Sequence, residues 1–358
     1  MGWFTPHRAT GLGSLPHQDE LTALRVIAKA MPHWPHWPQL PAKMPAQGFV
    51  VQYVQPLIKL GVLTEIPLKD PVFARLDAGW ESKAVMFFNN YLAFVNGDAG
   101  AEDVFALTGE AFAGLEAFIN NFTHLFPAAE GVKGHVSGPL TVGLQIKDER
   151  GRACFYDETL RDLLVKCLAV EAVLEARRLK ALGKPVLIFI DDPALFLIGA
   201  STHITLTKEM ASAALLTVIE ALHGEGVKVG VHSCAGIDWS ILFALPVDII
   251  SFDAYHYFTG MALQAEGLAA YLERGGAMAW GLVPTSEEAW QETPETILSR
   301  FAGQCSELAG RGVDINMLRQ KIIWTPSCGT GALPIDLAEH IYQLMEGVVR
   351  RLSALDNR

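Results

Sequence analysis

The sequence predicts a single (β/α)8 barrel that spans residues 1–358 as one domain. Three observations support this prediction: short apolar runs alternate with helix-length segments from about residue 130 onward, the runs are apolar throughout, and eight of them can be counted. Parallel strands joined by crossover helices produce this alternation, and strands covered on both faces lack polar positions. A length of 358 residues is compatible with one barrel.

Six candidate strands lie in the C-terminal two-thirds of the chain. They span residues 135–142, 186–190, 227–232, 248–253, 277–282 and 321–325. Two upstream segments, residues 9–14 and 48–54, bring the predicted count to eight.

The segments between these strands carry helical signals. In residues 160–182, apolar residues such as Leu164 and Leu168 recur at helical spacing, and Gly183 ends the segment before Pro185. The next helix, over residues 207–222, opens with Thr207 as a capping residue and closes before Gly224.

Residues 31–45 contain five prolines and two tryptophans. Proline lacks a backbone N–H group and has a fixed φ angle, so this composition excludes a regular helix and a central strand. We expect a packed, extended Pro/Trp-rich loop near the N-terminus.

The composition excludes several classes of function. Half of the residues are apolar, 19% are charged and the net charge is −11, so we expect a globular chain and no nucleic-acid partner. No run of eighteen apolar residues and no signal peptide is found, which predicts a cytoplasmic protein with no membrane partner. Five scattered cysteines do not resemble a disulfide framework and leave thiol or metal chemistry open.

Polar residues end several of the predicted strands, which is where barrels place their active sites. His232 and Cys234 follow one strand, Asp253 follows the next, and Cys328 follows the last. Zinc accepts nitrogen, sulfur and oxygen ligands of these kinds. The sequence therefore predicts a zinc site formed by His232, Cys234 and Cys328, with Asp253 as the fourth ligand or a close partner.

A purely structural interpretation competes with this one, because buried cysteine is most often a small core residue. The combination of three strand ends favours the metal. The remaining cysteines have no such setting and are assigned to packing: Cys154, Cys167 and Cys305.

These residues resemble the C-terminal catalytic barrel of cobalamin-independent methionine synthase, within the superfamily that includes uroporphyrinogen decarboxylase. The family carries a His-x-Cys, an acidic residue and a final Cys on one zinc. Further matches, in order along the chain, are Leu12-Gly-Ser-Leu-Pro16, Gly138-Pro-Leu-Thr141 and Ile190-Asp-Asp-Pro-Ala-Leu195.

The resemblance implies that zinc binds a substrate thiol such as homocysteine, lowers its pKa and positions it to accept a methyl group. It also implies that the turn containing Leu12 and Ser14 holds the carboxylate of the acceptor and that Asp191 holds its ammonium group. Three more residues near strand ends are candidates for the pocket wall: His17, His135 and Asp192.

The chain also departs from the family. At 358 residues it has room only for the catalytic barrel, and residues 281–286 replace a segment whose histidine is implicated in protonating folate. We therefore expect the donor to be a methylcorrinoid or a corrinoid protein rather than a methylated folate.

Two alternatives remain. One is a metal-free enzyme resembling uroporphyrinogen decarboxylase, which the sulfur ligands disfavour. The other is a non-catalytic corrinoid- or thiol-binding protein in which four protein ligands close a structural zinc.

Overall fold

A computed structural model describes residues 5–66 and 69–356 of the chain. Within these residues, the main sheet contains seven strands in the order β1-β10-β9-β8-β7-β6-β4, and every neighbouring pair is parallel. The strands are β1 (Arg8–Ala9), β4 (Val132–Ser137), β6 (Val186–Asp191), β7 (Lys228–Ser233), β8 (Ile249–Asp253), β9 (Ala277–Val283) and β10 (Ile322–Pro326). The class is α/β, as the alternation of strands and helices predicts.

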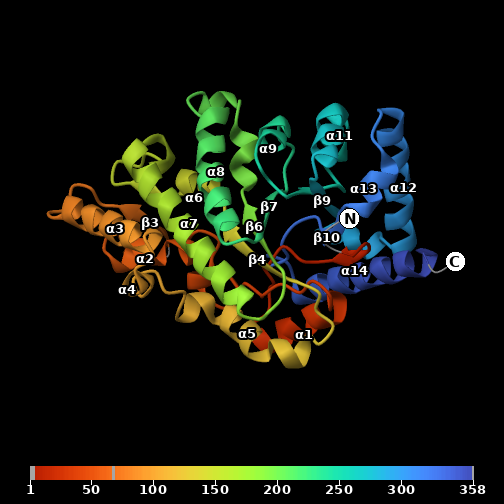
Figure 1. Ribbon diagram of the computed structural model, residues 1–358, viewed down its shortest axis with the longest axis horizontal. Helices are drawn as coiled ribbons and strands as arrows, with labels where there is room; N and C mark the ends of the chain where they lie inside the picture. Colours follow the sequence, from red (N-terminus) through yellow and green to blue (C-terminus); the bar gives the residue numbers. More distant parts are fainter. Residues whose placement is uncertain (1–4, 67–68, 357–358) are drawn as a thin grey trace.

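Helices cover this sheet on its outer side. Figure 1 shows the strands in the interior, with α8, α9, α11 and α12 along one side of the molecule and α1, α5 and α14 along the other. In the first half of the chain the helices are α1 (Glu20–Ala30), α2 (Gln55–Lys59), α3 (Trp80–Val95), α4 (Ala99–Glu102), α5 (Ala113–Leu125), α6 (Pro139–Gln145) and α7 (Glu158–Lys180). In the second half they are α8 (Lys208–Gly224), α9 (Ser240–Ala244), α10 (Phe258–Ala262), α11 (Ala265–Glu273), α12 (Pro294–Gly310), α13 (Ile315–Gln320) and α14 (Ile335–Asp356).

The two predicted long helices are present as α7 and α8. Thr207 caps α8 by accepting a hydrogen bond from the backbone N–H of Met210 at 3.2 Å. Gly183 follows α7 with a φ of 71°, the left-handed conformation that glycine adopts without strain. Two charged residues of α7 are buried, Glu171 and Glu175. Glu175 faces β4 and Trp37, since its carboxylate accepts from the backbone N–H of His135 and from Nε1 of Trp37.

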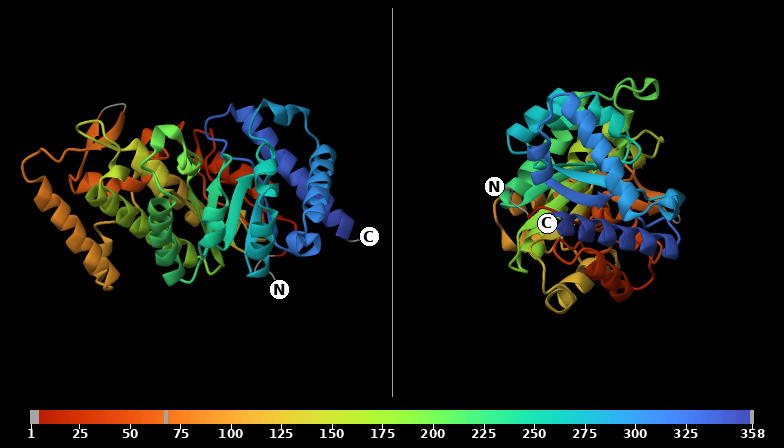
Figure 2. Two further views of the ribbon diagram at one scale, coloured as in Figure 1. Left: turned by 90° about the horizontal axis from the view of Figure 1, so that it is seen from above. Right: turned by 90° about the vertical axis from the view of Figure 1, so that its right-hand side faces the viewer.

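A second, smaller sheet lies beside the barrel and was not predicted. It consists of β2 (Leu63–Ile66), β3 (Lys69–Phe73) and β5 (Lys147–Asp148). β2, β3, α3 and α4 belong to the long segment between residue 50 and β4, whereas β5 follows α6. Figure 2 shows α3 at the end of the molecule opposite to α12 and α14.

Residues 33–39 of the Pro/Trp-rich segment lie between the two edge strands of the main sheet. Isolated parallel bridges pair His36 with Lys133 of β4, and Gln39 with Ser14, which follows β1. The backbone N–H of Gln39 donates to the carbonyl of Gly13 at 3.1 Å, and that of Lys133 donates to the carbonyl of Pro35 at 2.9 Å. This segment therefore connects the edges without forming a regular strand.

The predicted strand at residues 48–54 is wrong. Residues Val51–Val54 form a 3-10 helix that continues directly into α2, where Pro56 occupies the first turn. Pro56 favours helix initiation because its missing N–H group is not needed there. The predicted strand at residues 9–14 overlaps β1 only at Ala9. The main sheet in the described part of the chain has seven strands where eight were predicted, and complete (β/α)8 closure is not shown.

The observed bounds of β4 also differ from the predicted ones. The prediction began at His135 and ran to residue 142, whereas β4 ends at Ser137 and Pro139 begins α6. Elsewhere the predicted strands in the C-terminal two-thirds agree with β6 to β10 within two residues at each end.

Most buried apolar side chains form one continuous cluster from Ala9 to Leu352, and a smaller cluster, which includes Leu187, Phe189 and Ile249, fills the space enclosed by the sheet. Throughout residues 5–66 and 69–356, no helix has both the length and the apolar character needed to cross a lipid bilayer.

Candidate metal centre and adjoining pocket

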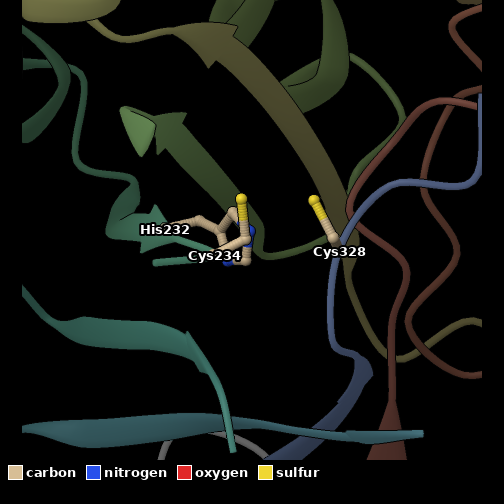
Figure 3. Close-up of side chains that lie close together, drawn as sticks. All are labelled: His232, Cys234 and Cys328. Atoms are coloured by element: carbon tan, nitrogen blue, oxygen red, sulfur yellow. The ribbon is translucent and has the colours of Figure 1, made fainter. Parts of the chain in front are cut away.

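Three of the four predicted metal ligands lie together at the carboxyl ends of the parallel strands. The ligand atoms of His232, Cys234 and Cys328 all lie within 4.8 Å of one another. Figure 3 shows that His232 and Cys234 come from one strand end and Cys328 from a separate segment of the chain. His232 lies in β7, Cys234 directly follows β7, and the turn after β10 supplies Cys328. A histidine and two cysteines within this distance can bind one zinc ion.

The environment of His232 leaves one ring nitrogen available for a metal. Nδ1 lies 2.9 Å from the hydroxyl of Ser251 on β8, and Nε2 is buried without a hydrogen-bond partner among the described residues. A Ser251 hydroxyl that accepts from Nδ1–H would leave the lone pair of Nε2 free. Metal-binding histidines are commonly oriented in this way by a partner on the other nitrogen.

The pKa values of the two cysteines are shifted in opposite directions. Hydrogen bonding with Cys328 lowers the pKa of the Cys234 thiol well below its usual value, and His232 contributes in the same direction. The same hydrogen bond, together with burial, raises the pKa of Cys328. This pairing favours one thiolate in the cluster, and a thiolate is the form of cysteine that binds metals. All five cysteines are free, and Cys154, Cys167 and Cys305 lie buried elsewhere, as predicted.

Asp253, predicted as the fourth ligand or a close partner, lies outside the group formed by His232, Cys234 and Cys328. Its Oδ1 atom accepts hydrogen bonds from the backbone N–H groups of Tyr255 at 3.0 Å and His256 at 2.9 Å. Its Oδ2 atom pairs with Nδ1 of His256 at 2.7 Å. The carboxylate closes its own turn after β8 and is not directed at the sulfur atoms, because short Asp side chains readily bond to backbone groups two or three residues ahead.

A pocket of about 450 Å³ adjoins the three ligands. The Pro/Trp-rich segment and the residues just after it form one wall, through Gln39, Pro41 and Phe49. The strand ends form the opposite wall. The complete lining is Leu12, Ser14, Gln39, Pro41, Ala42, Phe49, Asp191, Pro193, His232, Cys234, Cys328, Gly329, Gly331 and Ala332. All three predicted substrate-binding residues, Leu12, Ser14 and Asp191, are included.

Two adjacent aspartates at the end of β6 have different surroundings. Asp191 lines the pocket, and its Oδ1 atom is buried without a hydrogen-bond partner among the described residues. Burial raises its pKa to about 6, while Lys133 and His232 act in the opposite direction. An unpaired buried carboxylate oxygen that faces a pocket can accept a hydrogen bond from an ammonium group.

Asp192 does not reach the pocket, which corrects its assignment as a pocket residue. It accepts hydrogen bonds from the backbone N–H groups of Leu140 at 2.9 Å and Thr141 at 2.8 Å. These groups are in the first turn of α6, so Asp192 caps a helix that precedes it by some fifty residues in sequence.

The turn that contains Ser14 is held closely against the segment after β10. The carbonyl of Ser14 accepts a hydrogen bond from the backbone N–H of Thr330 at 3.0 Å, and its hydroxyl accepts one from Gly331 at 3.2 Å. A Cβ atom at Gly329 would overlap the Ser14 hydroxyl. Because Gly329 has no side chain, the turn that contains Ser14 can pack directly against the segment that follows Cys328.

His17 and His135 are buried but do not line the pocket. Nε2 of His17 lies 3.2 Å from the Glu339 carboxylate on α14. The ring of His135 stacks on Trp37 with 4.1 Å between centroids, and burial keeps its pKa well below the usual value. Both ring nitrogens of His135 are buried without a hydrogen-bond partner among the described residues. Neither candidate is therefore part of the pocket wall.

Sequence reasoning missed Lys133, which points into the barrel beside the residues of the pocket. Lys133 is fully buried, and its ammonium group donates a hydrogen bond to the carbonyl of Leu12. The predicted strand began two residues too late to include it. A lysine inside an apolar strand is a signal that could have identified this position, since lysine is almost never fully buried without a partner.

Comparisons with known proteins identify no family for this chain. No family model matches it, and no curated protein matches its sequence. Among solved structures, it is similar to a B12-independent methionine synthase from Shewanella sp. W3-18-1 in complex with selenomethionine, with 18% identity and a TM-score of 0.45 over 66% of this chain and 67% of that protein. It is also similar to a GH113 beta-mannanase from Alicyclobacillus acidocaldarius, with 12% identity and a TM-score of 0.42 over 99% of this chain and 98% of that one. Similarities at this level do not determine function, so the function has to be argued from the site itself.

Proposed function

We propose that this chain is a zinc-dependent methyltransferase that transfers a methyl group to a thiol, and that it is a short relative of the catalytic barrel of cobalamin-independent methionine synthase. One observation carries the proposal: His232, Cys234 and Cys328 meet within 4.8 Å at the edge of a pocket that Asp191 and Ser14 also line. In the same proposal the molecule is one (β/α)8 domain, in which residues 33–39 take the place of the eighth strand.

The donor set fits zinc. Two sulfur atoms and one imidazole nitrogen leave a coordination position open, as in catalytic rather than structural zinc sites. When bound, zinc would act as a Lewis acid that lowers the pKa of a thiol. The unpartnered Nε2 atom of His232 and the lowered pKa of Cys234 support this fit.

The residues of the pocket would bind and orient the acceptor. Asp191 offers a buried carboxylate oxygen to an ammonium group. Leu12 and Ser14 also line the pocket. The backbone N–H groups of such a turn would suit the carboxylate of the acceptor. The apolar wall formed by Pro41 and Phe49 would exclude water from the sulfur atom of the acceptor. These features support homocysteine or a related amino thiol as the substrate.

For the donor we propose a methylcorrinoid, free or carried by a protein. In the transfer, a sulfur–carbon bond forms while the carbon–cobalt bond breaks, and the bonding electrons leave with cobalt, so no protonation of the donor is needed. A methylated folate does need a proton at its leaving nitrogen. Residues 281–286 contain no histidine that could supply it. We expect methyl transfer from methylcobalamin and little transfer from methyltetrahydrofolate. Efficient transfer from methyltetrahydrofolate would refute the assignment of a methylcorrinoid as the donor.

Zinc content tests the site directly. The purified chain should hold about one zinc, and Cys234→Ser or Cys328→Ser should lose most of it, since each removes a ligand. Cys167→Ser is the matched control, because Cys167 is buried on α7. Asp253→Asn should also keep its zinc, because its carboxylate is bonded to Tyr255 and His256. Full retention of zinc in both ligand variants would refute the proposal.

A further inference from the structure

Gln39 is a nearly buried glutamine in the wall of the pocket, where it is only 5% exposed. Its backbone is fixed by residues on both sides of Ser14. Its N–H donates to the carbonyl of Gly13 at 3.1 Å, and its carbonyl accepts from the N–H of Leu15 at 2.9 Å. The side chain is therefore the part of Gln39 whose orientation has to be determined separately, and a carboxamide has one end that donates hydrogen bonds and one that accepts them.

A chain of two hydrogen bonds fixes the orientation of the Gln39 amide. Nε2 of Gln39 donates to Oε1 of Gln52 at 2.6 Å, and Nε2 of Gln52 donates to the carbonyl of Ala111. A backbone carbonyl can only accept, so it determines the orientation of the Gln52 amide, which in turn determines that of Gln39. All three residues are buried, so reversing either amide would place two acceptors or two donors against each other away from water.

The oxygen of Gln39 is the end of the amide that remains for a ligand. No described residue donates a hydrogen bond to Oε1 of Gln39, and Gln39 lines the same pocket as Asp191. Asp191 also has a carboxylate oxygen without a partner among the described residues. Two unpaired acceptors in one pocket suit a ligand group with more than one N–H donor, such as a primary ammonium group.

We propose that Gln39 is a specificity-determining residue of the pocket, whose oxygen accepts a hydrogen bond from the amine of the methyl acceptor. In the same proposal, Gln52 is a positioning residue that keeps the oxygen of Gln39, rather than its NH2 group, toward the ligand. This inference rests on the proposed function, which places the acceptor in this pocket. It predicts that the pocket prefers ligands that donate a hydrogen bond from the carbon next to their carboxylate over ligands that only accept one there.

Four compounds that differ only at this carbon test the preference: methionine, its 2-hydroxy analogue, 4-(methylthio)-2-oxobutanoate and 4-(methylthio)butanoate. They carry, in this order, an ammonium group, a hydroxyl that donates or accepts, a carbonyl that only accepts, and no polar group. Calorimetric titration into the purified chain requires no methyl donor and no turnover. Gln39→Leu should weaken methionine and the hydroxy analogue by about fivefold to tenfold, the loss of one hydrogen bond, and change the other two by less than about twofold. Equal changes for all four compounds would overturn the proposal.

A substitution at Gln52 should change the affinities of different ligands in opposite directions. Gln52→Met fills the space but accepts no hydrogen bond from Nε2 of Gln39, so the amide of Gln39 can turn its NH2 group toward the pocket. Methionine should then bind more weakly and the oxo compound more tightly, each by about threefold or more. Gln52→Glu keeps an acceptor for Nε2 of Gln39 and should retain the wild-type order of affinities. Uniform weakening of all four compounds by Gln52→Met would refute the positioning role.

Gln47 provides the matched control, because it is a second buried glutamine and is not among the residues that line the pocket. Its Oε1 atom accepts from the backbone N–H of Leu40 at 2.8 Å, and its Nε2 atom donates to the carbonyl of Glu110 at 3.0 Å. Gln47→Met removes comparable contacts and should leave the ratios of the four affinities unchanged.

The titrations also separate this inference from the proposed function. If the wild-type chain shows the expected order of affinities but holds no zinc and transfers no methyl group, the proposed function fails and the role of Gln39 stands. If the wild-type chain binds none of the four compounds, or binds all of them equally, the role of Gln39 is refuted whether or not zinc is bound.

Discussion

From β6 to β10, each strand is joined to the next by a continuous parallel ladder, whereas two isolated bridges connect residues 33–39 to the strands on either side. In the first region, register alone brings side chains together: His232 pairs with Ser251 across neighbouring strands, and their side chains are in contact. In the second region, side chains replace missing backbone partners. Glu175 on α7 accepts hydrogen bonds from the backbone N–H of His135 and from Nε1 of Trp37, both at 2.8 Å.

The difference shows how a segment that proline prevents from pairing regularly can connect the two edges of a sheet. Pro35 and Pro38 have no N–H groups to donate. The buried backbone N–H of His135, on the neighbouring strand β4, also needs an acceptor, because an unsatisfied buried donor costs about 1–3 kcal/mol. The buried carboxylate of Glu175 supplies it, and Trp37 fills the space beside it. Stability in this region therefore depends on a few side chains, which makes it sensitive to substitution.

The largest expected effect is at Trp37. Trp37→Ala removes a fully buried ring that stacks on His135 and bonds to Glu175, so unfolding free energy should fall by about 3–5 kcal/mol. Trp290→Ala is the control, because Trp290 is 51% exposed although it also stacks on a histidine, His340. Urea unfolding measures the unfolding free energy of both variants. Similar, small losses of unfolding free energy in the two variants would contradict the importance assigned to residues 33–39 for stability.

The next effect is a pH dependence at Glu175. Burial raises the pKa of Glu175 to about 8, so the folded chain retains a proton that the unfolded chain releases near pH 4.5. The stability that this group contributes is fully present below pH 4.5 and is lost as the pH rises through about 8.

Glu175→Gln imitates the protonated side chain and should remove this dependence. Near pH 4.5 the variant and the wild type should be about equally stable, and above pH 8 the variant should be more stable, by on the order of 1–3 kcal/mol. Urea unfolding across this range measures the difference. A difference that stays constant with pH would show that Glu175 is ionised in the folded chain throughout.

The smallest effect is expected in the regular region. Thr207→Ala removes the side-chain cap of α8, whose oxygen accepts from Met210 N–H at 3.2 Å, and should cost about 1 kcal/mol. Thr207→Ser keeps the hydroxyl and should restore most of that loss in the same unfolding experiment. A loss as large as that of Trp37→Ala would mean that the two regions do not differ in sensitivity.

The regular region was largely predictable from the sequence. Strands β6 to β10 are short apolar runs bounded by polar residues, and helices α7 and α8 carry their own start and stop signals. The structure of residues 48–54 was not predictable in this way. An apolar run that includes β-branched residues can also form a short buried helix when a proline follows at the start of the next turn.

At the site, the sequence by itself determined that His232, Cys234 and Cys328 meet, because residues two apart at a strand end lie on one side and the carboxyl ends of parallel strands share an edge. Only the tertiary structure decided which neighbouring residue serves which purpose. Asp191 faces the pocket and Asp192 caps α6, because successive side chains of a strand point to opposite faces. It also decided that Lys133 lies beside the pocket, because its partner, the carbonyl of Leu12, comes from a distant part of the chain.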